Sequence, residues 1–277
     1  MSAAFLSVVV TTYNRPDALG AVLDALARQQ DAGGFEVLVA DDGSGAETRA
    51  LIARFQQRFP VALHHVWQED DGFRAAAARN AAVARSRGRY LLFLDGDCVP
   101  LPDFCARHRR LMEPGWCVAG NRILLAEAFT RQLLASERPA DVVDWDLAAW
   151  QAATARGDAN KATALRRWSL GPLRKLGARR WQRVRTCNLG VWRQDFLAVD
   201  GFDESFTGWG YEDSDFAVRL MRHGVRIKDG RFAVPVLHLW HRENDRRNEP
   251  ENRARLNETL KSSHIRARAG LSAHPAT

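Results

Sequence analysis

The chain has 277 residues, of which 46% are hydrophobic, so it can bury the core of one large domain or of two small ones. It contains no run of 18 apolar residues, and no basic segment precedes the short apolar run near its start, so we expect neither a membrane-spanning helix nor a signal peptide. The formal net charge of +7 is compatible with nucleic acid, anionic lipid or phosphorylated small molecules as partners, and it does not select one of them.

Patterns typical of strands and helices alternate along the first third of the chain. Short apolar or β-branched runs predict buried strands at 6–12, 35–44, 61–67 and 89–95. Helical spacing and good helix formers predict helices at 16–30, 46–58 and 75–88. Pro16 suits the first position of its helix, and Gly88 is expected to cap the end of the third helix. This alternation predicts βαβ units and a mostly parallel sheet.

Polar residues follow three of these strands, at Thr11 to Asn14, at Asp41 and Asp42, and at Asp95 to Asp97. Ligands of parallel α/β sheets gather outside the carboxyl ends of the strands, so we expect the three groups to share a site. Two carboxylates as close as Asp95 and Asp97 repel each other unless a cation or a proton lies nearby. Carboxylate oxygens suit Mg²⁺ or Mn²⁺, although a solvated acidic turn is the alternative.

The segment 126–184 differs in composition and predicts a helical, basic insertion. From 166 to 185 there are eight basic residues and no acidic one, with two tryptophans among them. This pattern fits a solvated helical face or a surface that binds anionic lipid; nucleic acid is not expected. We therefore expect a cytoplasmic protein, with possible peripheral attachment to the inner face of the membrane. Residues 251–277 read as a polar, loosely ordered tail.

The four cysteines form no CxxC pair and suggest no disulfide framework, which favours reduced thiols; they are Cys98, Cys105, Cys117 and Cys187.

Four motifs occur in an order that resembles the family 2 glycosyltransferases with a GT-A fold. They are VVVTTYNRP, VLVADDGS, ARNAAVARSRGRYLLFLDGDC and GWGYEDSDF. The C-terminal half also resembles the galactosyltransferase-type module of chondroitin-polymerase-like enzymes. The resemblance implies a single α/β domain, with a Rossmann-like, mostly parallel sheet flanked by helices. Residues 1–125 would form its nucleotide-sugar-binding half and residues 185–250 its acceptor and catalytic half.

The resemblance also implies which residues bind the nucleotide-sugar. Thr11 and Tyr13 would contact the uridine. Asp41, together with Asp42, would bind the uracil or the ribose. Arg79 would lie near the nucleotide or its phosphates, and Asp95 near the ribose or the sugar.

The metal site implied by the resemblance combines Asp97 with His241 and His238, holding Mn²⁺ or Mg²⁺. His241 matches the histidine that precedes NEP in the related module, although the spacing to Asn248 is one residue longer here. Neutral imidazoles together with carboxylates are a reasonable ligand set for Mn²⁺.

In GWGYEDSDF (208–216), the family pattern assigns Asp213 as the base that deprotonates the acceptor hydroxyl. Glu212 would hydrogen-bond the acceptor or the donor sugar. Trp209 would offer a flat apolar face to the C–H groups of the sugar. Acids at the start of a helix, which suit its dipole, are the structural alternative. Tyr211 stands where the related pattern often has glycine.

Asn188 and Leu189 would line the donor-sugar pocket, whereas Arg193 and Asp195 are expected to be structural.

These roles imply a metal-dependent, inverting transfer of galactose or an N-acetylhexosamine from a UDP-sugar to a glycan or lipid-linked acceptor. The pathway would be surface polysaccharide or glycolipid synthesis. One alternative is a nucleotidyltransferase that forms sugar nucleotides, but its glycine-rich basic loop is not found in TTYNRPDALG (11–20). The other is a non-catalytic protein that binds sugar nucleotides, against which the presence of both Asp97 and Asp213 argues.

Overall fold

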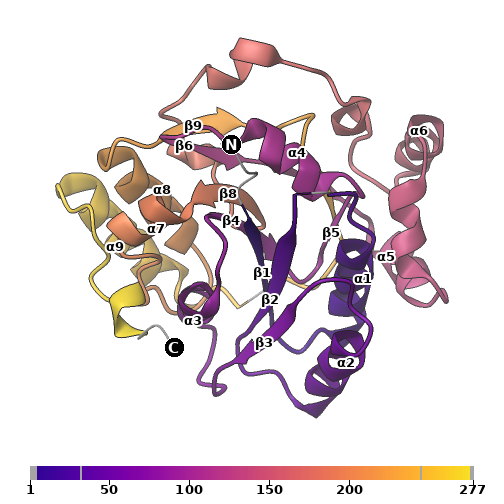
Figure 1. The fold of residues 1–277 in the computed structure, drawn as a ribbon, viewed down its shortest axis with the longest axis horizontal. Helices are drawn as coiled ribbons and strands as arrows, with labels where there is room; N and C mark the ends of the chain where they lie inside the picture. Colours follow the sequence, from indigo (N-terminus) through magenta and orange to yellow (C-terminus); the bar gives the residue numbers. More distant parts are fainter. Residues whose placement is uncertain (1–4, 32, 244, 275–277) are drawn as a thin grey trace.

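The computed structural model describes residues 5–31, 33–243 and 245–274. A seven-stranded sheet in the order β3-β2-β1-β4-β8-β6-β9 runs through its centre (Figure 1). The elements of its first half are β1 (Leu6–Thr12), α1 (Pro16–Ala27), β2 (Phe35–Asp41), α2 (Ala46–Gln56), β3 (Leu63–Trp67), α3 (Ala75–Arg85) and β4 (Tyr90–Asp95). The strands β1 to β4 pair in parallel, which confirms the predicted alternation and the start of α1 at Pro16.

The second half adds antiparallel pairing and a small second sheet. Its elements are β5 (Cys98–Pro100), α4 (Phe104–Leu111), β6 (Trp116–Ala119), β7 (Asn121–Leu124), α5 (Glu127–Leu134), α6 (Leu147–Arg156), β8 (Asn188–Trp192), α7 (Arg193–Ala198), α8 (Glu212–Arg222), β9 (Arg226–Asp229), β10 (Pro235–His238) and α9 (Glu249–Lys261). Strand β8 runs antiparallel to both β4 and β6. The small sheet has the order β5-β10-β7 and brings β10 against the chain just after β4.

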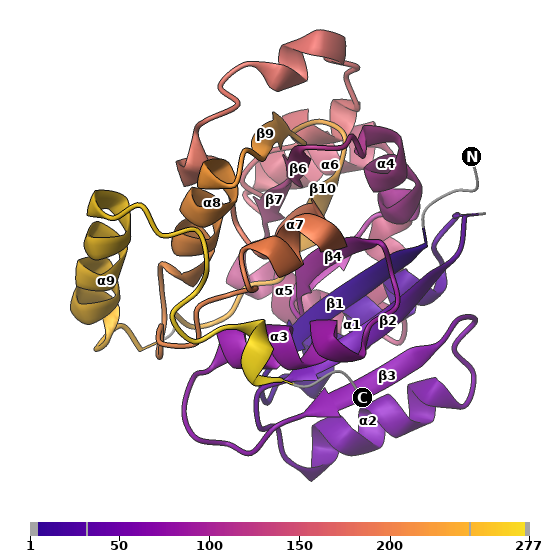
Figure 2. The same ribbon diagram turned by 60° about the vertical axis from the view of Figure 1, so that its left-hand side comes forward.

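The central sheet buries both of its faces, because side chains alternate along each strand. On β1, Val8 and Val10 contribute to a core shared with α1 and α2. Val9 points to the other face, in a core shared with α3, α7 and α8. Helices therefore cover both faces of the sheet (Figure 2).

The four cysteines are buried and unpaired, as expected. Within the ranges given above, the helices are too short or too polar to cross a membrane.

Gly88 does not cap α3, so that prediction is wrong. The helix ends at Arg85, and the backbone N–H of Gly88 donates to Ser7 Oγ at 2.7 Å. A Cβ atom at position 88 would lie 2.5 Å from the backbone nitrogen of Ser7. Glycine is needed here because the chain passes close to β1.

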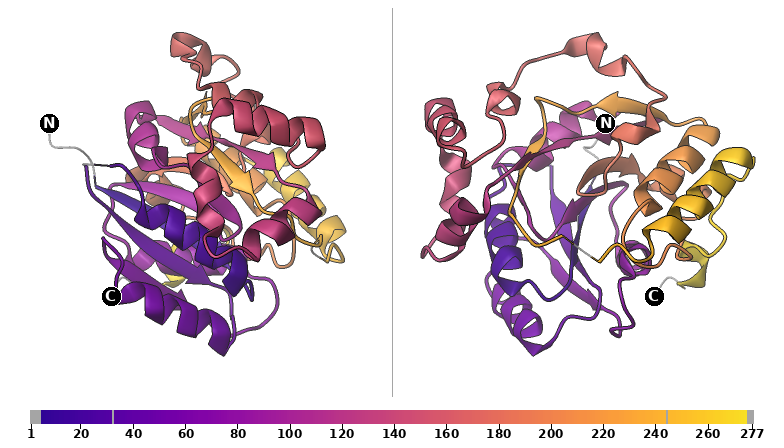
Figure 3. Two further views of the ribbon diagram at one scale, coloured as in Figure 1. Left: turned by 90° about the vertical axis from the view of Figure 1, so that its right-hand side faces the viewer. Right: turned by 180° about the vertical axis from the view of Figure 1, so that it is seen from behind.

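The segment 126–184 is only partly helical. Its first part, with α5 and α6, lies beside α1 (Figure 3). Asp146 starts α6 by accepting a hydrogen bond from the N–H of Ala149, and Gly157 ends it in a left-handed conformation. Its second part has only short 3₁₀ turns between 163 and 183 and arches past β9 (Figures 1 and 2).

The expectation of a loosely ordered C-terminal tail at 251–277 is also wrong for residues 251–261. Residues 249–261 form α9, which lies against α8 (Figure 2). Asn252 of α9 is buried and donates to the backbone oxygens of Thr207 and Trp209. Thr259 donates to the buried carboxylate of Asp215 on α8 at 2.7 Å. The polar residues of α9 thus hold it in place through hydrogen bonds as well as packing.

Candidate active site

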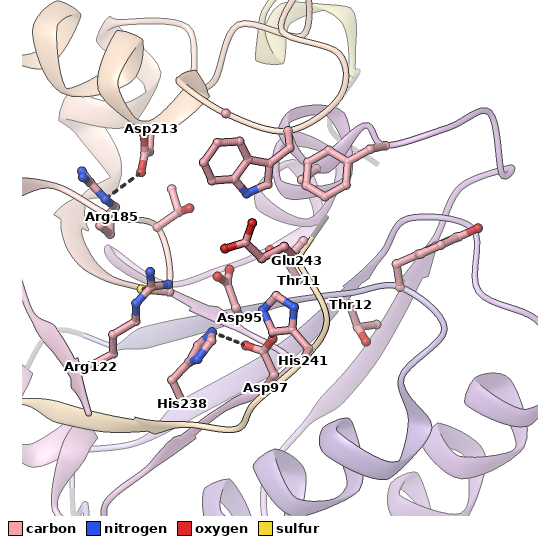
Figure 4. A pocket seen from close by; sticks show the side chains of 18 of the residues that line it. Thr11, Thr12, Asp95, Asp97, Arg122, Arg185, Asp213, His238, His241 and Glu243 are labelled. Atoms are coloured by element: carbon pink, nitrogen blue, oxygen red, sulfur yellow. Dashed lines mark hydrogen bonds and ion pairs between the residues drawn. The ribbon is translucent and has the colours of Figure 1, made fainter. Parts of the chain in front are cut away.

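A cavity of about 850 Å³ opens at the carboxyl ends of β1 and β4 (Figure 4). Parallel pairing sets Thr11 of β1 beside Asp95 of β4, so the ends of these strands share one edge. Most of the residues predicted from the sequence line this cavity, namely Thr11, Tyr13, Asp42, Arg79, Asp95, Asp97, Trp209, Glu212, Asp213, His238 and His241. The structure therefore brings together motifs that lie as far apart in the chain as residues 11 and 241.

Asp41 and Asn188 are not among the lining residues. Asp41 is fully buried, and its carboxylate binds the N–H of Ser44 at 2.8 Å and His65 Nε2 at 2.7 Å. Its neighbour Asp42 lines the cavity, because successive residues point to opposite sides of an extended chain. The role predicted for these acids, binding the uracil or the ribose, thus fits the position of Asp42 alone.

The side chain of Asn188 is used inside the protein. Its amide group donates to the backbone oxygens of Asn121 and Val234, and its oxygen lies 3.1 Å from His108 Nε2. Leu189 is fully buried in the core beneath α3 and α7. The prediction that these two residues line a sugar pocket is therefore wrong. The Asn188 side chain instead links the start of β8 to the backbone of Asn121 and Val234.

Asp97, His238 and His241 come together at one wall of the cavity (Figure 4). The Nε2 atoms of His238 and His241 lie 3.7 and 3.4 Å from the Asp97 carboxylate, distances longer than normal hydrogen bonds. Burial lowers the pKa of His238 to about 4, so its imidazole is neutral at pH 7, the form that binds metal ions. A carboxylate with an imidazole on either side is a donor set that suits a divalent ion such as Mn²⁺.

Arg79 of α3 connects the two acidic clusters. Its guanidinium donates to Thr11 Oγ1 at 3.0 Å, to Glu212 Oε1 at 3.0 Å and to Asp95 Oδ1 at 3.3 Å. The side chain is 5% exposed, so these buried ion pairs fix its orientation. Arg79 lines the cavity as predicted, but its hydrogen bonds to the protein indicate that it positions both acids.

Asp213 lies at the other side of the cavity, in the first turn of α8 (Figure 4). Burial raises the pKa of its carboxyl group to about 6, and the neighbouring Glu212 acts in the same direction. Arg185, whose Nε lies 4.0 Å from Asp213 Oδ2, acts in the opposite direction. A carboxylate with a pKa near 6 is ionised at pH 7 and is basic enough to accept a proton from a reacting group.

The loop before α8 has an unusual backbone. Gly208, Gly210 and Tyr211 all have positive φ values, of 74°, 108° and 72°. A side chain at position 208 would also collide with Asn248, the residue before α9. The left-handed conformation at Tyr211 is easiest for glycine, which explains why the related pattern often has glycine there. Trp209, between the glycines, lines the cavity beneath the guanidinium of Arg246.

Several lining residues were not predicted as site residues, among them Arg122, Arg185, Tyr211, Trp240 and Arg246. Arg185 belongs to the basic run 166–185, but in the structure it faces Asp213. The signal that could have identified Arg122 was a charged residue directly before the apolar pair Ile123 and Leu124 in strand β7.

Two known family models match the chain. The model of "Glycosyl transferase family 2" matches residues 7–160, and that of "N-terminal domain of galactosyltransferase" matches residues 175–241. Both matches extend into the segment 126–184, beyond the motifs that carried the resemblance.

Curated relatives support the same grouping. The chain is 31% identical over 224 residues to validoxylamine A glucosyltransferase of Streptomyces hygroscopicus subsp. jinggangensis, covering 79% of this chain and 52% of that protein. It is 28% identical over 279 residues to hyaluronan synthase of Pasteurella multocida, covering 92% of this chain and 26% of the synthase. It is 24% identical over 275 residues to chondroitin synthase of Escherichia coli, covering 92% of this chain and 37% of that synthase. The chain thus spans about half the length of the first relative and less than that of the two synthases.

Solved structures share the fold. TarS residues 1–349 of S. aureus in complex with UDP superpose with a TM-score of 0.60 at 15% identity, covering 97% of this chain and 68% of that one. The mannosyltransferase PcManGT of Pyrobaculum calidifontis, in complex with GDP-Man and Mn²⁺, gives a TM-score of 0.59 at 19% identity. This match covers 93% of this chain and 64% of that one. The predicted α/β fold of the GT-A type is confirmed. Because the first family match covers more than half of its residues, this chain belongs to glycosyl transferase family 2, the family of sugar-transferring enzymes that its motifs predicted.

Proposed function

We propose that this chain is a metal-dependent, inverting glycosyltransferase that uses a UDP-sugar. The transferred sugar is of the galactose or N-acetylhexosamine type, and the acceptor is a glycan or lipid-linked sugar of a surface polysaccharide or glycolipid. One observation carries the proposal: a cluster of Asp97 with two histidines and a separate carboxylate, Asp213, face the same cavity from two sides (Figure 4).

The two sides of the cavity would have different roles, metal binding on one side and proton acceptance on the other. Asp97, His238 and His241 would hold the divalent ion, which when bound would neutralise charge on the donor's diphosphate. Asp213 accepts the proton of the acceptor hydroxyl as its oxygen attacks the anomeric carbon. Arg79 keeps Asp95 and Glu212 at fixed positions between these groups. Trp209 offers an apolar surface to the sugar's C–H groups.

Donor choice is tested first. Release of nucleoside diphosphate is measured with Mn²⁺, with Mg²⁺ and with chelator, across a panel of UDP-sugars. GDP-mannose is included because a structure of the same fold holds it. We expect turnover with at least one UDP-sugar and its loss on chelation. Tight Mn²⁺–UDP binding without turnover of any donor would instead favour a non-catalytic sugar-nucleotide-binding protein. The nucleotidyltransferase alternative is disfavoured by the family match.

The base assignment is tested with Asp213→Asn. The amide cannot accept the proton, so we expect transfer to fall by roughly 10² to 10⁴-fold. Affinity for Mn²⁺–UDP, measured by calorimetry, should change by less than about twofold, because Asp213 lies apart from the metal ligands. Asp144→Asn is the matched control, since Asp144 is mostly exposed and does not line the cavity. Joint loss of binding and transfer in Asp213→Asn would contradict the assignment.

A further inference from the structure

Arg122 is a cationic side chain of the cavity to which no role is yet assigned. It lies on β7, where side chains alternate between the core and the cavity. Ile123 is fully buried in the core, whereas Arg122 and Leu124 line the cavity. Parallel pairing with β10 places Leu124 beside His238, and Figure 4 shows Arg122 next to that histidine, directed toward the space below Asp213.

The ion pairs of the cavity distinguish Arg122 from its neighbours. Four other lining arginines each have a carboxylate oxygen within 4.0 Å; they are Arg15, Arg79, Arg185 and Arg246. Among the described residues, Arg122 has no carboxylate within that distance, and its only hydrogen bond is a long contact of 3.9 Å to Cys187 Sγ. The fifth, Arg242, is exposed on the loop after the metal-site histidines. Arg122 therefore faces the cavity with most of its N–H groups available to a ligand.

The surroundings of Arg122 favour an anionic ligand close to the metal site. Strand pairing places its neighbour Leu124 beside His238, and Arg122 itself lies beside that histidine (Figure 4), so the guanidinium is on the metal side of the cavity. A guanidinium presents its N–H groups in a planar fork that matches two oxygens of a phosphate. It is also partly buried, where such a charge-assisted contact is stronger than in water.

We propose that Arg122 binds the diphosphate of the nucleotide-sugar donor and stabilises the charge that this group gains during transfer. The inference rests on the proposed function. In the step concerned, the bond between the acceptor oxygen and the anomeric carbon forms while the bond from that carbon to the diphosphate oxygen breaks. The electron pair stays on the diphosphate oxygen, near Arg122, and the acceptor proton goes to Asp213. Arg122 is thus a catalytic residue that acts on the leaving group.

The test compares UDP with UMP, which lacks the second phosphate. In Arg122→Gln we expect calorimetric affinity for UDP, in the presence of Mn²⁺, to fall about tenfold, and affinity for UMP to stay within about twofold. Turnover of the donor at saturation should fall about 10²-fold, because the contact strengthens as charge develops. Arg122→Lys keeps the charge but loses the fork, so it should restore only part of the UDP affinity.

The matched control is Arg110→Gln, because Arg110 is an exposed arginine that does not line the cavity. Thermal unfolding of all variants separates loss of ligand contact from loss of fold. Unchanged UDP affinity and turnover in Arg122→Gln would overturn the inference. So would a rise in acceptor KM at unchanged UDP affinity, which would assign the arginine to an anionic group on the acceptor. If the wild type turns over no donor, the proposed function fails, and the comparison of UDP with UMP still decides whether Arg122 binds the diphosphate.

Discussion

Asp213 should set the lower pH limit of catalysis. Burial raises the pKa of its carboxyl group to about 6, Glu212 adds to this, and Arg185 and Arg79 oppose it. The base must be ionised to accept a proton, so activity is retained above this pKa and lost below it. We expect turnover at saturating donor and Mn²⁺ to fall about tenfold for each pH unit below about 6. A profile that stays flat down to pH 5 would contradict the role of Asp213.

Arg185→Gln provides the control for this limit. Removing a nearby positive charge disfavours the carboxylate, so the pKa of Asp213 should rise. The acidic limb of the pH profile of turnover should then move to higher pH. The shift should be small, because the Arg185 side chain is half-exposed and its distance to Asp213 is 4.0 Å. Measuring UDP affinity at the same pH values separates this limb from titration of Asp42, whose pKa burial also raises to about 6.

At the level of elements, α9 supports the loop that carries Trp209. Asn252 is 1% exposed and donates to the backbone oxygens of Thr207 and Trp209, at 3.0 and 3.4 Å. In Asn252→Ala the Trp209 oxygen loses this donor and the Thr207 oxygen keeps only the longer bond from Asn248, so we expect the free energy of unfolding to fall by about 1–2 kcal/mol. The loop that carries Trp209 should also become more mobile, which would lower turnover more than it lowers the affinity for Mn²⁺–UDP.

Asn257→Ala is the control, because Asn257 is an exposed asparagine of the same helix and shares the same gain in helix propensity. Chemical denaturation gives the stability difference, and donor turnover gives the functional one. Equal stability and turnover in the two variants would show that α9 does not support the loop.

Local patterns predicted the strands and helices of the first half well, because each is a short periodic segment with a clear start. They failed where distant contacts decide the structure. Gly88 looks like a helix cap, but the closeness of Ser7 is what requires glycine there. Residues 251–261 look like part of a polar tail, but contacts with the 207–209 loop and α8 hold them in the helix α9.

Across the whole molecule, most of the site was predictable because its residues sit in motifs at strand ends and at a helix start. What a motif does not specify is the direction of each side chain. Asp41 and Asp42 are adjacent, yet only Asp42 lines the cavity, and Asn188 points into the protein. Arg122 escaped prediction because its role depends on its having no carboxylate partner among the described residues, which only the fold reveals.

The basic segment 166–185 carries the last prediction, that the molecule binds anionic membrane surfaces. Several of its basic side chains are used internally, such as Arg174, which donates to the backbone oxygens of Asp229 and Arg231. The segment nevertheless exposes Leu173 by 60% and Leu176 by 64%, along with Trp168. Exposed apolar side chains among arginines suit the interface of an anionic bilayer.

We expect the chain to sediment with phosphatidylglycerol vesicles at low salt and to be released at high salt, because screening weakens the attraction. Replacing both Leu173 and Leu176 by serine should weaken binding at every salt concentration, since the loss is apolar contact. Leu260→Ser, which alters an exposed leucine of α9, should bind as the wild type does. Equal binding to neutral and anionic vesicles, or none to either, would contradict the prediction and leave the segment 166–185 as a solvated surface.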